Sequence, residues 1–276
     1  MNRKTTALTL VELLISLALL GIVLTAVVSV NIGTARSASL LQARNELLPE
    51  TQIAQNYMAN KLRQAFYVVP NNTVVVLGTT AADTLRNPRT GTGAWTIGVD
   101  PIVAFVLPPK NYVNGAAATN SLCPPYSAPA GTTDDNDNCF YFYAFYALKR
   151  GDMVNAVSGA GDPGNDTAND PTSWVLMEFR RRFENTSYST SNLPTGGSGG
   201  RLLMDYLLPT TQTGADLLFN VLTTTPQAPG TTSITLRLAS ARSVAGQALR
   251  LPAATSVPDR YILTVYPRNV GKTLSN

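Results

Sequence analysis

The sequence predicts an α+β protein in which one long N-terminal helix carries an antiparallel β-sheet head. An apolar segment near the N-terminus is long enough to span a membrane, and a helical pattern of apolar residues continues directly after it. The rest of the chain has short β-rich runs between turn residues. We therefore expect one long N-terminal helix that ends near residue 69 and a single head domain over 70–276.

The first 36 residues predict a membrane-spanning segment. Arg3 and Lys4 precede it, and the 23 residues from Leu13 to Ala35 carry no charge before Arg36 ends the run. About 20 apolar residues cross a bilayer, and the basic leader favours a cytoplasmic N-terminus. Everything after Arg36 is then exported, and the chain is expected in the inner membrane with a single span.

Two ordinary explanations of this segment fit poorly. A signal peptide has an apolar region of only about 7 to 15 residues and ends in a small-residue cleavage site. A plain signal anchor leaves Glu12 unexplained, because an ionised acid in a spanning helix costs several kcal/mol unless it is paired. Glu12 is therefore a candidate functional residue.

The segment from Ala7 to Leu14, ALTLVELL, resembles the class III signal of type IV prepilins and type II secretion pseudopilins. This resemblance implies a leader peptide at residues 1–7, cleavage between Ala7 and Leu8 by a prepilin peptidase, methylation of Leu8, and a transmembrane or filament-core helix over residues 8–35. Glu12 becomes the fifth residue of the mature chain, where the family's acid pairs with the N-terminal amine of a neighbouring subunit. The implied fold is pilin-like, with the N-terminal helix in the filament core and the head outside it.

Four positions refine the resemblance. Ala7 stands where glycine is usual and Leu8 where phenylalanine is usual, but alanine is small enough for the same pocket. Gly21 falls where the family keeps a glycine. Ser29 stands where many major pilins have a helix-kinking proline, which points away from a major pilin.

Residues 36–69 predict a water-exposed continuation of the helix with one apolar face, because apolar residues from Leu40 to Val69 recur at steps of three or four. Pro49 is expected to bend or briefly interrupt this helix, and Pro70 to end it near Val69. The order of residues 60–65 resembles the end of the long helix in minor pilins of the PilW and PulJ type.

Six strands are expected in the head, at residues 74–77, 102–107, 140–148, 174–183, 233–238 and 260–265. Ile234, Leu236 and Leu238 alternate with polar residues, so we expect one sheet face to pack on the stalk helix. The run from Gly214 to Leu222 is compatible with a helix or a strand.

The C-terminal segments 258–261 and 265–269 resemble the closing segment of PilW-like minor pilins. This favours a type IV pilus minor pilin over a PulJ-type pseudopilin. We expect the arginines of this region, Arg260 and Arg268, to face solvent.

Cys123 and Cys139 are separated by 15 residues, and in an exported chain a lone pair predicts a disulfide. Closing such a loop stabilises a protein by up to about 3 kcal/mol. A zinc site lacks ligands, since the chain has no histidine and two cysteines do not close such a site.

Two acidic loops raise the alternative of calcium binding, one at residues 134–138 and one with Asp162, Asp166 and Asp170. Neither has the spacing of a known calcium loop, and Asp, Asn and Gly are also the residues of solvated turns. No metal site and no cofactor are expected.

Neither catalysis nor direct nucleic-acid binding is expected. The chain has no histidine, phosphate-binding loop or nucleophile elbow. Its net charge of +4 falls to +2 when the leader is removed, which is too weak for steering by net charge alone. Arg180, Arg181 and Arg182 are the best candidate for a nucleic-acid patch, but such a run is also typical of a protected edge strand.

Together these features predict a non-enzymatic minor pilin that takes part in type IV pilus assembly, at the tip or in initiation. The expected partners are other minor pilins, the major pilin, the prepilin peptidase, the inner-membrane assembly platform and, before assembly, membrane lipid. The alternatives are a type II secretion minor pseudopilin and a pilus-linked DNA-uptake or adhesion subunit. A single-pass surface anchor with a β-rich binding head is the alternative from another class.

Overall fold

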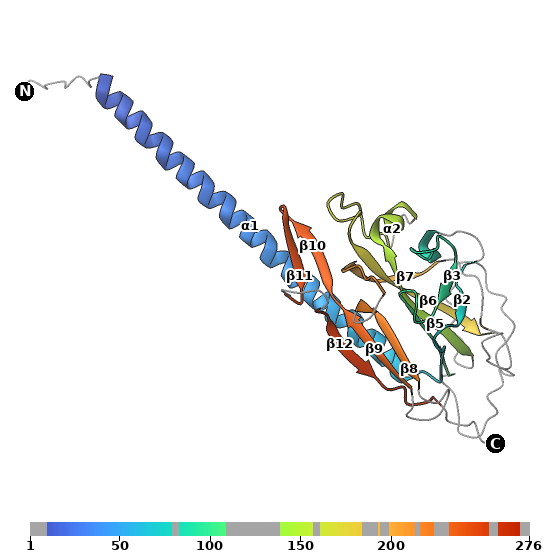
Figure 1. Ribbon diagram of the computed structural model, residues 1–276. Coiled ribbons are helices and arrows are strands. Elements are labelled where there is room, and N and C mark those ends of the chain that lie inside the picture. Colours follow the sequence, from blue (N-terminus) through green and yellow to red (C-terminus); the bar gives the residue numbers. More distant parts are fainter. Residues whose placement is uncertain are drawn as a thin grey trace, which may run out of the picture.

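A single helix, α1 (Leu10–Arg63), projects from a β-rich head and runs along it with its C-terminal half (Figure 1). This computed structural model describes residues 10–78, 83–108, 139–156, 161–183, 193, 199–212, 216–223, 232–253 and 259–270. At 1.5 Å per residue, the 54 residues of α1 extend over about 80 Å. The architecture is pilin-like α+β, as the sequence predicts.

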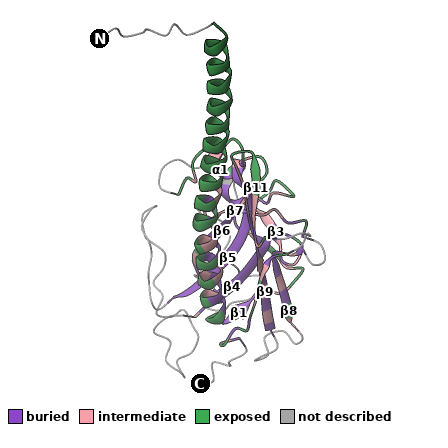
Figure 2. Ribbon diagram, turned by 90° about the vertical axis from the view of Figure 1, so that its left-hand side faces the viewer, coloured by how far each residue is buried: buried purple, intermediate pink, exposed green. Residues whose placement is uncertain are grey.

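The two halves of α1 differ in burial, as the change of colour along the helix shows (Figure 2). Residues 10–39 are exposed throughout. Further along, the buried residues recur at steps of three or four and so share one face of the helix, which packs on the head; they are Ala43, Leu47, Thr51, Ala54, Met58, Ala59 and Leu62.

The helix does not follow the expected boundaries. It continues through Pro49 without interruption, and it ends at Arg63 rather than near Val69. The earlier end has a physical reason, because the backbone after Arg63 joins a sheet. Phe66 N donates to Val106 O at 2.8 Å and Val69 N donates to Ala104 O at 2.9 Å, so these β-prone residues extend the sheet instead of the helix.

A seven-stranded antiparallel sheet forms the centre of the head, in the order β1-β4-β5-β6-β7-β10-β11. Its strands are β1 (Tyr67–Val68), β4 (Ile102–Leu107), β5 (Phe140–Lys149), β6 (Trp174–Phe183), β7 (Arg201–Leu207), β10 (Ser240–Val244) and β11 (Gln247–Leu251). The expected strands at 102–107 and 174–183 are found as β4 and β6 with the same bounds.

Smaller elements complete the head. A three-stranded sheet has the order β12-β9-β8 and contains β8 (Phe219–Thr223), β9 (Thr232–Leu238) and β12 (Tyr261–Val265). The segment left open between helix and strand thus ends in strand β8. The remaining elements are the pair β2 (Val74–Val76) and β3 (Ala94–Thr96), the short helix α2 (Arg150–Ala156) and a 3-10 turn, η1 (Asp83–Leu85).

Strand β5 is covered on both faces, which defines the layers of the head. On one face, the ring of Phe145 meets that of Tyr57 of α1 at a centroid distance of 6.3 Å. On the other face, the ring of Tyr146 meets that of Trp95 of β3 at 5.2 Å. The main sheet therefore lies between α1 and the layer that contains β2 and β3.

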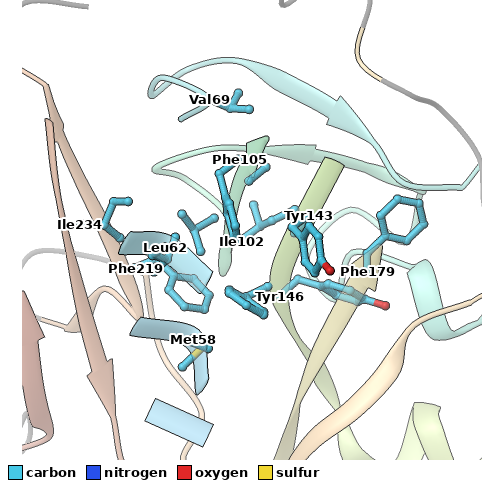
Figure 3. Close-up of a cluster of buried hydrophobic side chains, with 14 of the residues drawn as sticks. Met58, Leu62, Val69, Ile102, Phe105, Tyr143, Tyr146, Phe179, Phe219 and Ile234 are labelled. Atoms are coloured by element: carbon cyan, nitrogen blue, oxygen red, sulfur yellow. The ribbon is translucent and has the colours of Figure 1, made fainter. Parts of the chain in front are cut away.

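The end of α1 belongs to the core of the head (Figure 3). Met58 and Leu62 are fully buried and lie between side chains of both sheets. Phe219 and Ile234 come from the small sheet, and Phe105 comes from the main sheet. Because the stalk helix fills this space, head and stalk form one hydrophobic unit.

One expectation about the C-terminal strand is wrong. Arg260 is only 6% exposed, and its guanidinium lies 2.5 Å from Asp216 Oδ1 and also donates to the carbonyls of Leu208 and Pro209. A buried arginine needs such partners, and here they come from the loop before β8. Arg268 is exposed, as expected.

Candidate functional site

The exposed half of α1 is the most distinctive surface of the described residues. Its large apolar side chains, from Leu10 to Ile32, are all exposed, although such residues are normally buried in a soluble protein. The helix is long and apolar enough to cross a membrane, and the most apolar part of it makes no contact with the head. The composition of this half of α1 therefore suits an environment of membrane lipid or of a bundle of similar helices.

Polar groups on this half are mostly satisfied within the helix. Ser16 Oγ donates to Glu12 O, and Thr25 Oγ1 donates to Gly21 O, both at 2.7 Å, while Ser29 Oγ donates to Ala26 O at 3.3 Å. Such hydroxyls require no partner from outside the helix in an apolar environment.

Glu12 is different, because it is the one charged residue between Leu10 and Ala35. It lies in the first turn of the described helix, with its side chain exposed. A carboxylate near a helix N-terminus is favoured by the helix dipole, but in an apolar environment it also requires a cationic or hydrogen-bonding partner. Ala7 and Leu8 lie outside the described residues, so cleavage between them and methylation of Leu8 stay predictions.

A comparison with protein families bears on this segment. Residues 2–28 match the family model described as the prokaryotic N-terminal methylation motif. The match contains the basic leader, Glu12 and Gly21. The chain carries a type IV pilin or pseudopilin N-terminus. Searches of curated proteins and of solved structures found no match.

The motif and the fold agree on the general class. An N-terminal methylation motif opens a long apolar helix that packs against an antiparallel β-sheet head, which is the organisation of a membrane-anchored prepilin. Prepilin peptidase and pilus subunits are, in general terms, the partners of such a chain. The match ends at residue 28, so the head carries no assignment to a pilin subtype.

A polar junction fixes the stalk to the head where α1 first meets it. Arg242 of β10 lies 3.3 Å from Glu46 of α1. One helical turn further, Glu50 Oε1 accepts a hydrogen bond of 2.6 Å from the backbone nitrogen of Asp205 on β7. Burial raises the pKa of the Glu50 carboxyl, and burial likewise raises that of Asp205.

Tyr206 stands at the centre of this junction. The guanidinium of Arg150 lies 4.8 Å from the centre of its ring and that of Arg242 lies 4.5 Å from it, which are cation–π distances. The Tyr206 hydroxyl donates to Asp166 at 2.9 Å. Arg150 is fully buried and pairs with Asp205 at 2.9 Å and with Asp170. These contacts join the loop of residues 161–173 to β7 and β10.

The acidic loop at Asp162, Asp166 and Asp170 is thus part of a structural network. Asp162 accepts a bond from Gly164 N at 2.8 Å, while Asp166 and Asp170 have the arginine and tyrosine partners above. Burial alone would raise the pKa of Asp166, but hydrogen bonds from Asn169 and Tyr206 lower it below its usual value. Among the described residues, no three acidic or cysteine side chains are grouped so as to hold a metal ion. The loop at 134–138 lies outside them.

Only one cysteine of the predicted disulfide lies among the described residues. Cys139 is fully buried directly before β5 and is disulfide-bonded. Cys123 lies outside the described residues, so the pairing of Cys123 with Cys139 stays a prediction.

The three consecutive arginines lie near the end of β6. They pair with β5, beyond the last pair of β6 with β7, Glu178 with Arg201. The guanidinium of Arg180 lies 4.5 Å from the centre of the Tyr141 ring, and Arg182 is only 6% exposed. Two of the three are therefore engaged within the sheet.

Sequence reasoning missed the polar junction and the buried pair of Arg260 with Asp216. Glu46 and Arg242 are 196 positions apart, and Asp216 and Arg260 are 44 apart. No local pattern marks such pairs. The one available signal was charge next to apolar strand residues, as at Asp205 within β7 and at Arg260 directly before β12.

Proposed function

We propose that this chain is a minor pilin, cleaved between Ala7 and Leu8 and methylated at Leu8, that takes part in type IV pilus assembly at the filament tip or in initiation. The proposal is carried by Glu12, the single acid in the apolar N-terminal half of α1, which is not buried by the head. In a bundle of such helices, this carboxylate needs a cation, and the N-terminal amine of a neighbouring subunit supplies one.

Two features support a minor rather than a major subunit. The head is large, with a seven-stranded and a three-stranded sheet, and it packs poorly between neighbours in a filament body but without hindrance at an end. The helix also runs unbroken through Ser29, where many major pilins have a proline. Its partners are then the other minor pilins, the major pilin and the inner-membrane assembly platform, and it moves from the inner membrane to the cell surface.

The test is incorporation of a Glu12→Ala variant into sheared filaments, compared with Ser16→Ala as the matched control. Ser16 lies one turn further on the same helix face, and its hydroxyl bonds only within the helix among the described contacts. We expect both variants in the membrane fraction but only Ser16→Ala in filaments. Equal incorporation of the two would contradict the role of Glu12.

A type II secretion pseudopilin uses the same subunit chemistry. Loss of the chain separates the two: pilus number falls if it is a minor pilin, and protein secretion falls with normal pili if it is a pseudopilin. DNA uptake is tested by binding of the whole protein to DNA at increasing salt, which Arg180→Ala would weaken only if that strand contacts phosphates.

A further inference from the structure

The hairpin of β10 and β11 runs beside α1, and its turn points toward the N-terminal end of the helix (Figure 1). Two contacts fix its course. Ser240 hydrogen-bonds to Thr51, and Arg242 pairs with Glu46. Two strand residues cover about 7 Å, and the five helical residues from Thr51 to Glu46 cover about 7.5 Å. The strand therefore runs nearly along the helix axis.

The same geometry shows how far the turn of the hairpin reaches along the axis of α1. From Arg242 to Val244 the strand advances about another 7 Å, and the Ala245–Gly246 turn adds a few Å more. Five to six helical residues before Glu46 lie Leu40 and Leu41. Leu40 is the first residue of α1 that is not exposed, which agrees with a head that reaches this level.

This level lies next to the membrane surface when α1 spans the bilayer. The apolar span ends at Arg36, and Leu40 lies about 6 Å beyond it. The headgroup layer of one leaflet is about 5 to 8 Å thick. The turn of the hairpin therefore reaches the outer part of that layer.

The residues at this level suit an anionic lipid surface. The hairpin from Ser240 to Leu251 contains no acid, and its exposed turn residues, Ala245 to Ala248, are uncharged. Its two arginines lie further from the membrane, Arg242 beside Glu46 and Arg250 opposite Ala241. Arg36 precedes Leu40, Ala43 and Leu47 at helical steps of four, three and four, so it lies on the face of α1 under the hairpin. Arginine at this depth reaches headgroup phosphates with its apolar stem along the helix.

Arg242 has another role in this arrangement. Its guanidinium is 3.3 Å from Glu46 and 3.9 Å from Asp166 and lies over the Tyr206 ring. These partners partly neutralise it, and they hold β10 in position against α1. Arg242 therefore sets the reach of the hairpin, while Arg36 supplies the charge nearest the lipid.

We propose that, before assembly, the Ala245–Ala248 turn and Arg36 rest on the phospholipid headgroups of the outer leaflet of the inner membrane, so that the head docks on the bilayer that holds its stalk. This rests on the proposed function, because it requires α1 to span the membrane. The contact is lost when the subunit is extracted into a filament.

The experiment places the full-length protein in vesicles of phosphatidylcholine and phosphatidylglycerol that contain headgroup spin-labelled lipid. A fluorophore is attached in turn at Ala245→Cys, at Tyr266→Cys and at Ala26→Cys, without reductant. Tyr266 is exposed and lies close to Arg268, whose nitrogen bonds to Arg63 O at the far end of the helix. We expect quenching at position 245 to exceed that at 266 several-fold.

The arms separate the two proposals. If acyl-chain spin labels quench the fluorophore at position 26, α1 spans the membrane. If headgroup labels then quench the fluorophores at 245 and 266 equally, the docking proposal is wrong although the membrane span stands. No quenching at position 26 overturns both. Ala248→Glu should abolish the excess quenching at 245, and its matched variant Ala248→Lys should keep it. If position 245 is shielded only when other pilin subunits are added, its partner is protein, and lipid docking is wrong.

Discussion

Glu50 of the stalk helix and Asp205 of strand β7 are joined by a hydrogen bond of 2.6 Å from the Asp205 backbone nitrogen to the Glu50 carboxylate. Glu50→Ala leaves that partly buried nitrogen without its acceptor, which costs about 1 to 3 kcal/mol of unfolding free energy. Glu50→Gln keeps an acceptor oxygen and removes the buried charge, so its loss should be much smaller. Chemical denaturation of the two variants compares them, and equal losses would mean that the charge itself holds the junction.

The pH dependence of this residue has a definite sign. Burial raises the Glu50 pKa above 4.5, so the folded state holds its proton more tightly than the unfolded state. The stability that this proton binding gives is fully present below pH 4.5 and is lost as pH rises through the pKa of Glu50 in the folded state. The stability of Glu50→Gln relative to the natural chain should therefore increase as pH rises from 4.5 through the folded pKa and then level off. A relative stability that falls with pH would contradict the burial of this carboxyl.

Arg260 and Asp216 form a buried pair, in which Asp216 also accepts from the nitrogen of Thr211 at 2.6 Å. Arg260→Ala strands a buried carboxylate and should cost about 3 to 5 kcal/mol. Burial opposes ionisation of Asp216, but the bonds from Thr211 and Arg260 lower its pKa below 3.8. The stability that it gives is present above 3.8 and is lost as pH falls through the folded value.

A denaturation series with Arg260→Ala, Asp216→Asn and the double variant measures the coupling of this pair. Each single substitution leaves one buried charge without its partner, whereas the double variant removes both charges. The double variant should therefore lose less unfolding free energy than the sum of the losses in the two single variants. Strict additivity would show that the pair does not interact.

Two apolar residues of α1 test how the head holds the stalk. Met58 is fully buried between the sheets, whereas Ile53 is 68% exposed on the other side of the helix. Met58→Ala should cost about 2 to 5 kcal/mol of unfolding free energy, while Ile53→Ala should stay within about 0.5 kcal/mol. Thermal unfolding of the two variants measures the difference, and similar losses would contradict the packing face assigned to α1.

The predicted disulfide is tested by counting thiols. Alkylation of the denatured chain without reductant should modify neither cysteine, and alkylation after reduction should modify both. Cys139→Ser should lower the unfolding free energy by up to about 3 kcal/mol. Alkylation of Cys123 before reduction would exclude its pairing with Cys139.

The fold class and the clearest strands were predictable because their signals are local. Strand β4 is an uninterrupted apolar run rich in β-branched and aromatic residues, and β6 begins with the apolar run Trp174–Met177 and ends with aromatic Phe183, so pattern and structure agree on their bounds. Strands β10 and β11 lack such runs. Their turn places Ala245 at φ 50° and Gly246 at φ 78°, and alanine is an uncommon residue for that conformation. The hairpin is fixed instead by its contacts with α1.

The end of the stalk and the charged contacts depend on distant partners. Tyr67 and Val68 continue the helical pattern of the sequence, but pairing with Val106 and Phe105 of β4 converts them to strand β1. Arg260 looks like a solvent residue until the loop with Asp216 folds over it. Glu12, in contrast, can be singled out from the sequence alone, because a single acid within an apolar segment needs no tertiary context to be noticed, and its role in assembly stays a prediction.

A prepilin-like subunit is processed at its N-terminus before it enters a filament. Mass spectrometry of the N-terminal peptide, from cells with and without the resident prepilin peptidase, tests this processing of the chain most directly. The expected result is a mature chain that begins at methylated Leu8, present only when the peptidase is present. An intact Met1 in both strains, or cleavage between Ala26 and Ala38, would contradict it and indicate an anchored or secreted protein of another class.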